Sequence, residues 1–119
     1  MKWAYWKQYL AKTGGHIMSY TTVTIDNFDQ EVLACEKTVI VDFWAPWCGP
    51  CRNLAPIIDE VAEERTDIKV GKINIDDNKD LARQFKVMAI PTVLVFRNGE
   101  EVQRSVGPET KEEVLELLN

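Results

Sequence analysis

The 119-residue sequence has few of the residues that build disulfide-stapled proteins or metal sites, with only three cysteines and one histidine. Three cysteines are too few, and odd in number, for the disulfide framework of a small secreted scaffold. No stretch approaches the ~18 consecutive apolar residues typical of a transmembrane helix. The pattern therefore predicts neither a secreted disulfide scaffold nor a membrane-spanning segment.

Basic residues are also in the minority, since 14 lysines and arginines face 19 aspartates and glutamates, for a net charge of −5. A nucleic-acid-binding surface needs a basic patch or stripe, so this class of function is disfavoured. The apolar share of 45% and the charged share of 28% are those of an ordinary globular protein. The length is that of one domain.

The first 18 residues differ from the rest, because they contain lysines but no acidic residue. Lys7 interrupts the apolar run that a secretory signal would need. Residues 1–18 are therefore interpreted as a leader or tag-like segment, either disordered or forming a short amphipathic helix on three apolar residues at helical spacing, Trp3, Trp6 and Leu10. The folded domain is expected to cover residues 19–119.

From residue 20 onward, strand and helix patterns alternate. Runs rich in β-branched and apolar residues predict strands over residues 21–25, 38–44, 68–75, 92–97 and 102–106. Periodic apolar positions predict helices over residues 27–34, 48–64 and 80–85, and a last helix after Thr110. This order predicts an α/β fold with helices on both faces of one sheet and an antiparallel hairpin at its edge.

Local signals support several of these boundaries. Asn27 with Gln30, and Thr110 with Glu113, have the spacing of capping boxes that open helices. The dipeptide Asn98-Gly99 between the last two predicted strands is the strongest short signal for a β-hairpin.

The motif that carries chemistry, Trp47-Cys48-Gly49-Pro50-Cys51, lies where a predicted strand gives way to a helix. The first turn of a helix presents unpaired N–H groups and a positive dipole end, which stabilise an anion. A thiol there loses its proton more easily, and the thiolate is the nucleophile. The spacing of three brings both sulfur atoms to one helix face. The motif predicts a redox-active disulfide between Cys48 and Cys51.

Other uses of the two cysteines are weaker. A structural zinc site needs four ligands, and the other available side chains are Cys35 and His16. An iron–sulfur centre lacks its fourth cysteine. An inert disulfide across so short a loop constrains little chain entropy. Redox chemistry is favoured, as expected for this motif in a βαβ context.

The chain resembles the thioredoxin family over residues 19–119. The resemblance rests on Phe43-Trp44-Ala45-Pro46-Trp47-Cys48-Gly49-Pro50-Cys51, Ile90-Pro91-Thr92, Asn98-Gly99 and Val106-Gly107. It implies the thioredoxin fold, a three-layer α/β/α arrangement in which a central mixed five-stranded sheet is flanked by four helices.

The resemblance also implies an activity, the reduction of protein disulfides by dithiol–disulfide exchange. Cys48 would be the attacking thiolate and Cys51 the resolving thiol, re-reduced by thioredoxin reductase at the expense of NADPH. The protein would be a cytoplasmic monomer that needs no metal and no cofactor beyond its own disulfide. Implied substrates are proteins such as ribonucleotide reductase, methionine sulfoxide reductase and peroxiredoxins.

Two alternatives remain: a non-catalytic binding subunit of a larger assembly, and a disulfide oxidase or isomerase. Gly-Pro between the cysteines resembles the reducing members and disfavours the second alternative.

Asp42 lies within an apolar strand, where a charge is costly without a partner. It is interpreted as a buried carboxylate with a raised pKa that takes the proton of Cys51. Lys72 matches the family lysine that lies near this aspartate, and is assigned to the catalytic group by the resemblance.

By the same resemblance Pro91 is a cis-proline, which holds the backbone of Ile90 open for an extended substrate segment. The expected substrate-binding residues are Trp47, Gly49, Pro50, Ile90, Pro91 and Gly107, with Pro108 on the same rim. Ala89 stands where some relatives have glycine.

The remaining candidates are interpreted as structural. Cys35 is expected to be a half-buried apolar thiol, and Trp44 is expected in the core. The carboxylates of the long helix are expected to form a solvated face rather than a site, namely Asp59, Glu60, Glu63 and Glu64.

Overall fold

The structure, a computed structural model, describes residues 19–119. The leader and His16 lie outside the described residues. The strands are β1 (Thr21–Thr22), β2 (Thr38–Trp44), β3 (Ile68–Asn74), β4 (Thr92–Arg97) and β5 (Glu100–Val106). The helices are the π-helix η1 (Asp29–Leu33), α2 (Gly49–Glu64), α3 (Lys79–Gln84) and α4 (Lys111–Glu116). The predicted order of elements is confirmed.

The strands form one mixed sheet in the order β1-β3-β2-β4-β5. β1, β3 and β2 run parallel, while β4 and β5 are antiparallel to their neighbours. β2 lies at the centre, and its residues from Val39 to Phe43 are buried. A strand covered on both faces was predicted from its continuous apolar run.

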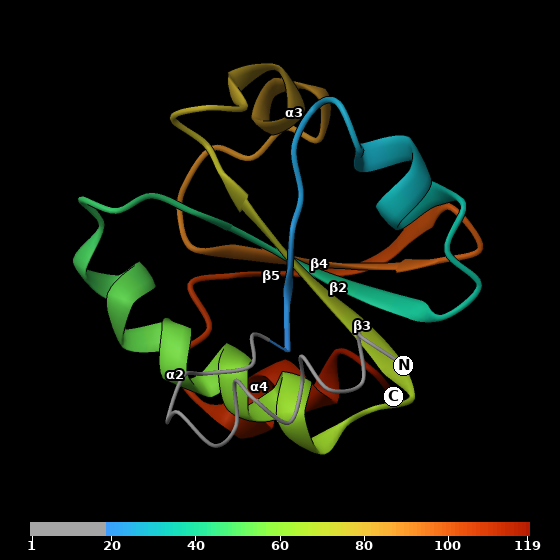
Figure 1. Cartoon of the computed structure of the whole chain (residues 1–119). Coiled ribbons are helices and arrows are strands. Elements are labelled where there is room, and N and C mark those ends of the chain that lie inside the picture. The colour runs from blue at the N-terminus through green and yellow to red at the C-terminus, as the bar shows by residue number, and fades with distance from the viewer. Residues whose placement is uncertain (1–18) are drawn as a thin grey trace, which may run out of the picture.

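Helices cover both faces of this sheet, as Figure 1 shows: α2 and α4 lie on one side, and η1 and α3 on the other. Each side has its own core, one centred on Phe28, Phe43 and Phe96, the other on Ile40, Leu54 and Ile58. None of the helices formed by the described residues has the length and apolarity needed to span a bilayer. The predicted three-layer thioredoxin fold is confirmed.

The first strand is shorter than predicted, with two residues in place of the expected 21–25. The backbone leaves the ladder because side chains take its next N–H groups. The N–H of Thr24 donates to Oδ1 of Asn27 at 2.8 Å, and that of Ile25 donates to Oδ1 of Asn78 at 2.9 Å.

The capping box expected at Asn27 is wrong. The Asn27 side chain points back along the chain, and its Nδ2 also donates to the carbonyl of Thr22 at 3.1 Å. The helix begins two residues later, at Asp29, as a single π-helical turn without a side-chain cap. The same amide that would cap the helix instead ends the strand.

The C-terminal signals hold. Asn98 and Gly99 both have positive φ, 53° and 80°, as a tight hairpin turn requires. Oγ1 of Thr110 accepts a hydrogen bond from the N–H of Glu113 at 3.1 Å. The Glu113 carboxylate accepts from the N–H of Glu109 rather than from that of Thr110.

The Gly99→Ala substitution is expected to destabilise the fold by about 2 kcal/mol. Alanine pays for a positive φ, a cost of about 1–2 kcal/mol, and its Cβ would lie only 3.1 Å from the carbonyl oxygen of Leu33. Urea unfolding measures the loss. Gly107→Ala is the matched control, because φ is 67° there but no atom lies within 4 Å of the added Cβ. Equal losses in both variants would contradict the role of the Leu33 contact.

Candidate functional site

Cys48 is the residue that caps helix α2. The chain leaves β2 at Trp44, turns through a short loop, and enters the helix at Gly49. Sγ of Cys48 accepts a hydrogen bond from the N–H of Cys51 at 3.2 Å. Pro50 is tolerated in this first turn because its missing N–H would have had no intrahelical partner. The sulfur thus lies at the positive end of a 16-residue helix, where a thiolate is stabilised.

Cys48 and Cys51 form a disulfide in this structure, with their Cα atoms 5.2 Å apart. Both residues are buried, and Cys51 is the deeper of the two. Sγ of Cys48 lies 3.8 Å from the carbonyl oxygen of Ile90. The predicted pairing is confirmed.

The peptide bond between Ile90 and Pro91 is cis, as the resemblance implied. It lines a groove of about 670 Å³, and the loop after β5 forms another wall of this groove. The carbonyl of Pro91 accepts from the N–H of Gly107 at 2.8 Å, which ties the two walls together. Four of the predicted substrate-binding residues line this groove, Pro50, Ile90, Pro91 and Gly107, and Ala89 and Pro108 lie there too.

Trp47 and Gly49 do not line this groove. The Trp47 side chain is 65% exposed, and its indole N–H donates to the carboxylate of Asp76 at 3.1 Å. The hydrogen bond holds a large apolar ring on the surface next to Cys48. Gly49 has no atom within 4 Å of where a Cβ would stand, so the surface in front of it is open.

Asp42 is a buried carboxylate, 2% exposed, and its Oδ1 has no hydrogen-bond partner among the residues that the structure describes. Burial raises its pKa to about 7, while the charge of Lys72 lowers it and that of Asp59 raises it. The predicted direction of the shift is confirmed. A carboxyl group with this pKa exchanges its proton near neutral pH.

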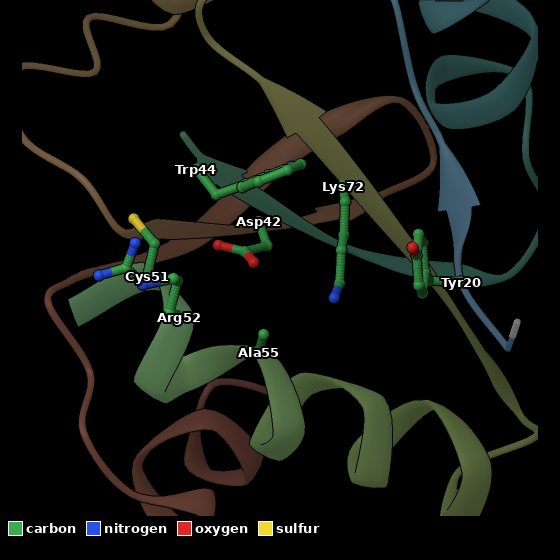
Figure 2. A pocket seen from close by; sticks show the side chains of 7 residues that line it. All are labelled: Tyr20, Asp42, Trp44, Cys51, Arg52, Ala55 and Lys72. Atoms are coloured by element: carbon green, nitrogen blue, oxygen red, sulfur yellow. The ribbon is translucent and has the colours of Figure 1, made fainter. Parts of the chain in front are cut away.

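Asp42 faces a cavity of about 140 Å³ between β2, β3 and the start of α2. Figure 2 shows Asp42 between the Cys51–Arg52 end of the helix and the side chain of Lys72. The same cavity is therefore lined by both the carboxyl group and the inner cysteine.

Lys72 is the direct register partner of Asp42 on the neighbouring strand. Its Nζ nevertheless donates to Oδ1 of Asp59 at 2.9 Å and lies 4.2 Å from the centre of the Tyr20 ring. The structure thus places Lys72 next to Asp42 on the neighbouring strand, as predicted, but its ammonium group pairs with Asp59.

The interpretation of Asp59 as part of a solvated face is incomplete, because its side chain is 48% exposed but its carboxylate also pairs with Lys72, which is 10% exposed. Cys51, Ala55 and Asp59 follow at intervals of four residues, a spacing that places them on one face of a helix. That signal was present in the sequence. Tyr20 was missed as well, and no local pattern marks it, because its contact with Lys72 is set by the pairing of β1 with β3.

The other structural interpretations hold. Cys35 is partly buried against the core and is not in a disulfide. Trp44 is partly buried and forms one wall of the cavity. Glu60 and Glu64 lie on the surface, where they pair with Lys111. Within residues 19–119 no cluster of three or more histidine, cysteine or acidic side chains is able to hold a metal ion.

A redox-active cysteine pair at a helix start, facing a cis-proline on the adjoining loop, defines the class of thiol–disulfide oxidoreductases. Comparison with known proteins narrows the class. The family model for thioredoxin matches residues 19–119. The thioredoxin of Pyropia yezoensis is 47% identical over 103 residues, covering 86% of this chain and 96% of the relative.

Bacterial relatives agree. The thioredoxin of Mycobacterium tuberculosis strain H37Rv is 46% identical over 98 residues, covering 82% of this chain and 84% of the relative. A bifunctional thioredoxin reductase/thioredoxin of Mycobacterium leprae is 44% identical over 98 residues, covering 82% of this chain and 21% of that protein. The chain belongs to the thioredoxin family, and its Cys48–Cys51 pair carries out dithiol–disulfide exchange.

The buried carboxyl group predicts a pH-dependent stability. Asp42 ionises near pH 3.8 when unfolded and near pH 7 when folded. Between these values the folded state binds more protons, so the free energy of unfolding falls as pH rises. The isosteric Asp42→Asn variant lacks this loss, and its advantage over the parent protein should grow by about 4 kcal/mol between pH 4 and pH 8. Urea unfolding of the disulfide form at several pH values measures it.

Asp80→Asn is the control, because Asp80 is exposed and its ion pair within the described residues is with Arg83 at the surface. Its stability is expected to follow that of the parent protein across the pH range. Parallel curves for Asp42→Asn and the parent would contradict the raised pKa.

Proposed function

We propose that this protein reduces disulfides in other proteins, with Cys48 as nucleophile and Cys51 as resolving thiol. The observation that supports the assignment best is the position of Cys48. Its sulfur caps a long helix and lies 3.8 Å from the carbonyl oxygen of Ile90, which lines the groove, whereas Cys51 is among the residues that line the cavity.

The first step joins the protein to its substrate. The Cys48 thiolate attacks one sulfur of the substrate disulfide, the substrate S–S bond breaks, and a mixed disulfide with Cys48 forms. The departing substrate sulfur leaves as a thiolate and takes a proton from water. The N–H groups and dipole at the helix start stabilise the attacking thiolate before the step.

The second step releases the substrate. Cys51 gives its proton to the Asp42 carboxylate, and the Cys51 thiolate attacks Sγ of Cys48. The mixed disulfide breaks, the second substrate sulfur leaves as a thiolate, and the two electrons of the dithiol have passed to the substrate. The pKa of about 7 for Asp42 supports this assignment, because a carboxyl group near neutral pKa can both take and return a proton.

The groove beside Ile90 would hold an extended segment of the substrate, as in other cases where a peptide aligns along exposed backbone. Gly107 favours close approach, because the space in front of its Cα is free for 4 Å. The exposed Trp47 ring would supply apolar contact beside the reacting sulfur. We assign Lys72 to the proton-transfer step because its positive charge lowers the pKa of Asp42.

Re-reduction by thioredoxin reductase at the expense of NADPH is part of the proposal, as are a monomeric state and the absence of a bound cofactor. The reductase as electron source is supported by the Mycobacterium leprae relative, whose name joins a thioredoxin reductase and a thioredoxin in one protein. Ribonucleotide reductase, methionine sulfoxide reductase and peroxiredoxins stay the expected substrates. A cytoplasmic location is proposed on the low cysteine count. Residues 19–119 are proposed to suffice for exchange.

Cys48→Ser is expected to abolish reduction of insulin by dithiothreitol through this protein, because serine cannot form the mixed disulfide. Cys51→Ser should instead accumulate a covalent adduct with insulin, visible as a mass shift that dithiothreitol reverses. Cys35→Ser is the control and should keep full turnover. Equal turnover by Cys48→Ser and the parent protein would remove the proposal.

With thioredoxin reductase, NADPH and insulin, adding this protein should accelerate NADPH consumption in proportion to its concentration. Absorbance at the NADPH band records the rate, and the doubly substituted Cys48→Ser, Cys51→Ser variant is the control. A rate independent of added protein would argue against the reductase as its electron source.

A further inference from the structure

The charge of Lys72 lies in an unexpected place. Asp42 and Lys72 are paired in register on adjacent strands and line the same cavity, so an ion pair between them would satisfy both. Instead Oδ1 of Asp42 has no partner, and the one ion pair of Lys72 within the described residues is with Asp59.

Asp59 reaches Lys72 from a different element of the fold. It belongs to α2, two turns after Cys51, and its carboxylate is half-exposed whereas the lysine side chain is 10% exposed. The ion pair with Asp59 therefore draws the Lys72 ammonium group toward α2 rather than toward the Asp42 carboxylate.

Tyr20 supports the same position from the other side. Its ring centre lies 4.2 Å from Nζ of Lys72, the distance of a cation–π contact. In Figure 2 the lysine side chain runs between Tyr20 and Asp42 toward the helix. Two independent contacts thus favour this rotamer of Lys72.

We propose that Asp59 and Tyr20 are positioning residues, which hold the Lys72 ammonium group away from Asp42 so that this carboxylate stays free to take the proton of Cys51. The inference rests on the proton transfer proposed above. A carboxylate locked in an ion pair is stabilised in its charged form and is a weaker base.

Among residues 19–119, few other charged groups surround Asp42. Lys72 faces it from β3, and Asp59 and Arg52 come from α2 together with the Cys51 sulfur. Val93, its register partner on β4, is apolar. Among these groups, the position of the Lys72 ammonium group therefore has the largest effect on the electrostatic potential at Asp42.

The test is a direct titration of Asp42 in the disulfide form, by NMR of the carboxyl carbon in protein labelled at aspartate. Asp59→Asn frees Lys72 to approach Asp42, so the midpoint should fall from about 7 by roughly one unit. Tyr20→Leu, which removes the ring, should shift it in the same direction. Asp59→Glu and Tyr20→Phe keep the charge and the ring, and should restore a midpoint near that of the parent.

Two controls separate positioning from a general change in charge. Glu60→Gln removes a neighbouring carboxylate that pairs with Lys111 and should leave the midpoint unchanged. In a Lys72→Met background, Asp59→Asn should lose most of its effect, as a double-mutant cycle requires for an action through Lys72. Persistence of the full shift there, or no shift in Asp59→Asn itself, would overturn the inference.

The titration needs no turnover, so the two proposals fail separately. An Asp42 midpoint unmoved by Asp59→Asn, in a protein that still reduces insulin through Cys48, refutes the positioning role alone. Insulin reduction that survives Cys48→Ser refutes the proposed function, whatever the titration gives. Asp59 is half-exposed, and thermal unfolding of Asp59→Asn confirms that the variant is folded during the measurement.

Discussion

The hydrogen bond from the Cys51 N–H to the Cys48 sulfur is the contact on which the site depends. It makes Cys48 the N-cap residue of α2. The sulfur that reacts therefore also accepts a hydrogen bond from one of the N–H groups that have no partner within the helix. The sheet fixes where this happens, because β2 is the central strand and delivers the chain to the helix from the middle of the core. The Cys48 sulfur therefore serves both as the helix cap and as one atom of the redox-active disulfide.

A second constraint comes from burying a carboxyl group beside that sulfur. Burial removes the Asp42 carboxyl group from water and raises its pKa to about 7, and its Oδ1 has no partner among the described residues. A buried polar group without a partner lowers the stability of a protein. Such a group suits the proton transfer proposed above, and the charges of Lys72 and Asp59 act on its pKa in opposite directions.

The sequence predicted most of the fold because its strongest signals are local. The apolar run of β2, the Asn98-Gly99 turn and the cap at Thr110 each settle their element without distant partners. The errors fall where distant groups compete. Asn27 was expected to cap a helix, but its amide serves the strand before it, and the neighbouring Ile25 N–H goes to Asn78, 53 residues away. The same holds for the site: the cysteines and Asp42 were visible, whereas Tyr20 meets Lys72 only after β1 and β3 pair.

Two of the hollows formed by the described residues share no lining residue. The groove of about 670 Å³ is lined by Ile90, whose carbonyl oxygen lies 3.8 Å from Sγ of Cys48, and the cavity of about 140 Å³ is lined by Cys51 and Asp42. The latter has room for several water molecules, and the exposed Arg52 stands in its wall. In the proposed reaction, a substrate segment bound in the groove covers none of the residues that line the cavity, so the proton taken by Asp42 can pass to solvent there.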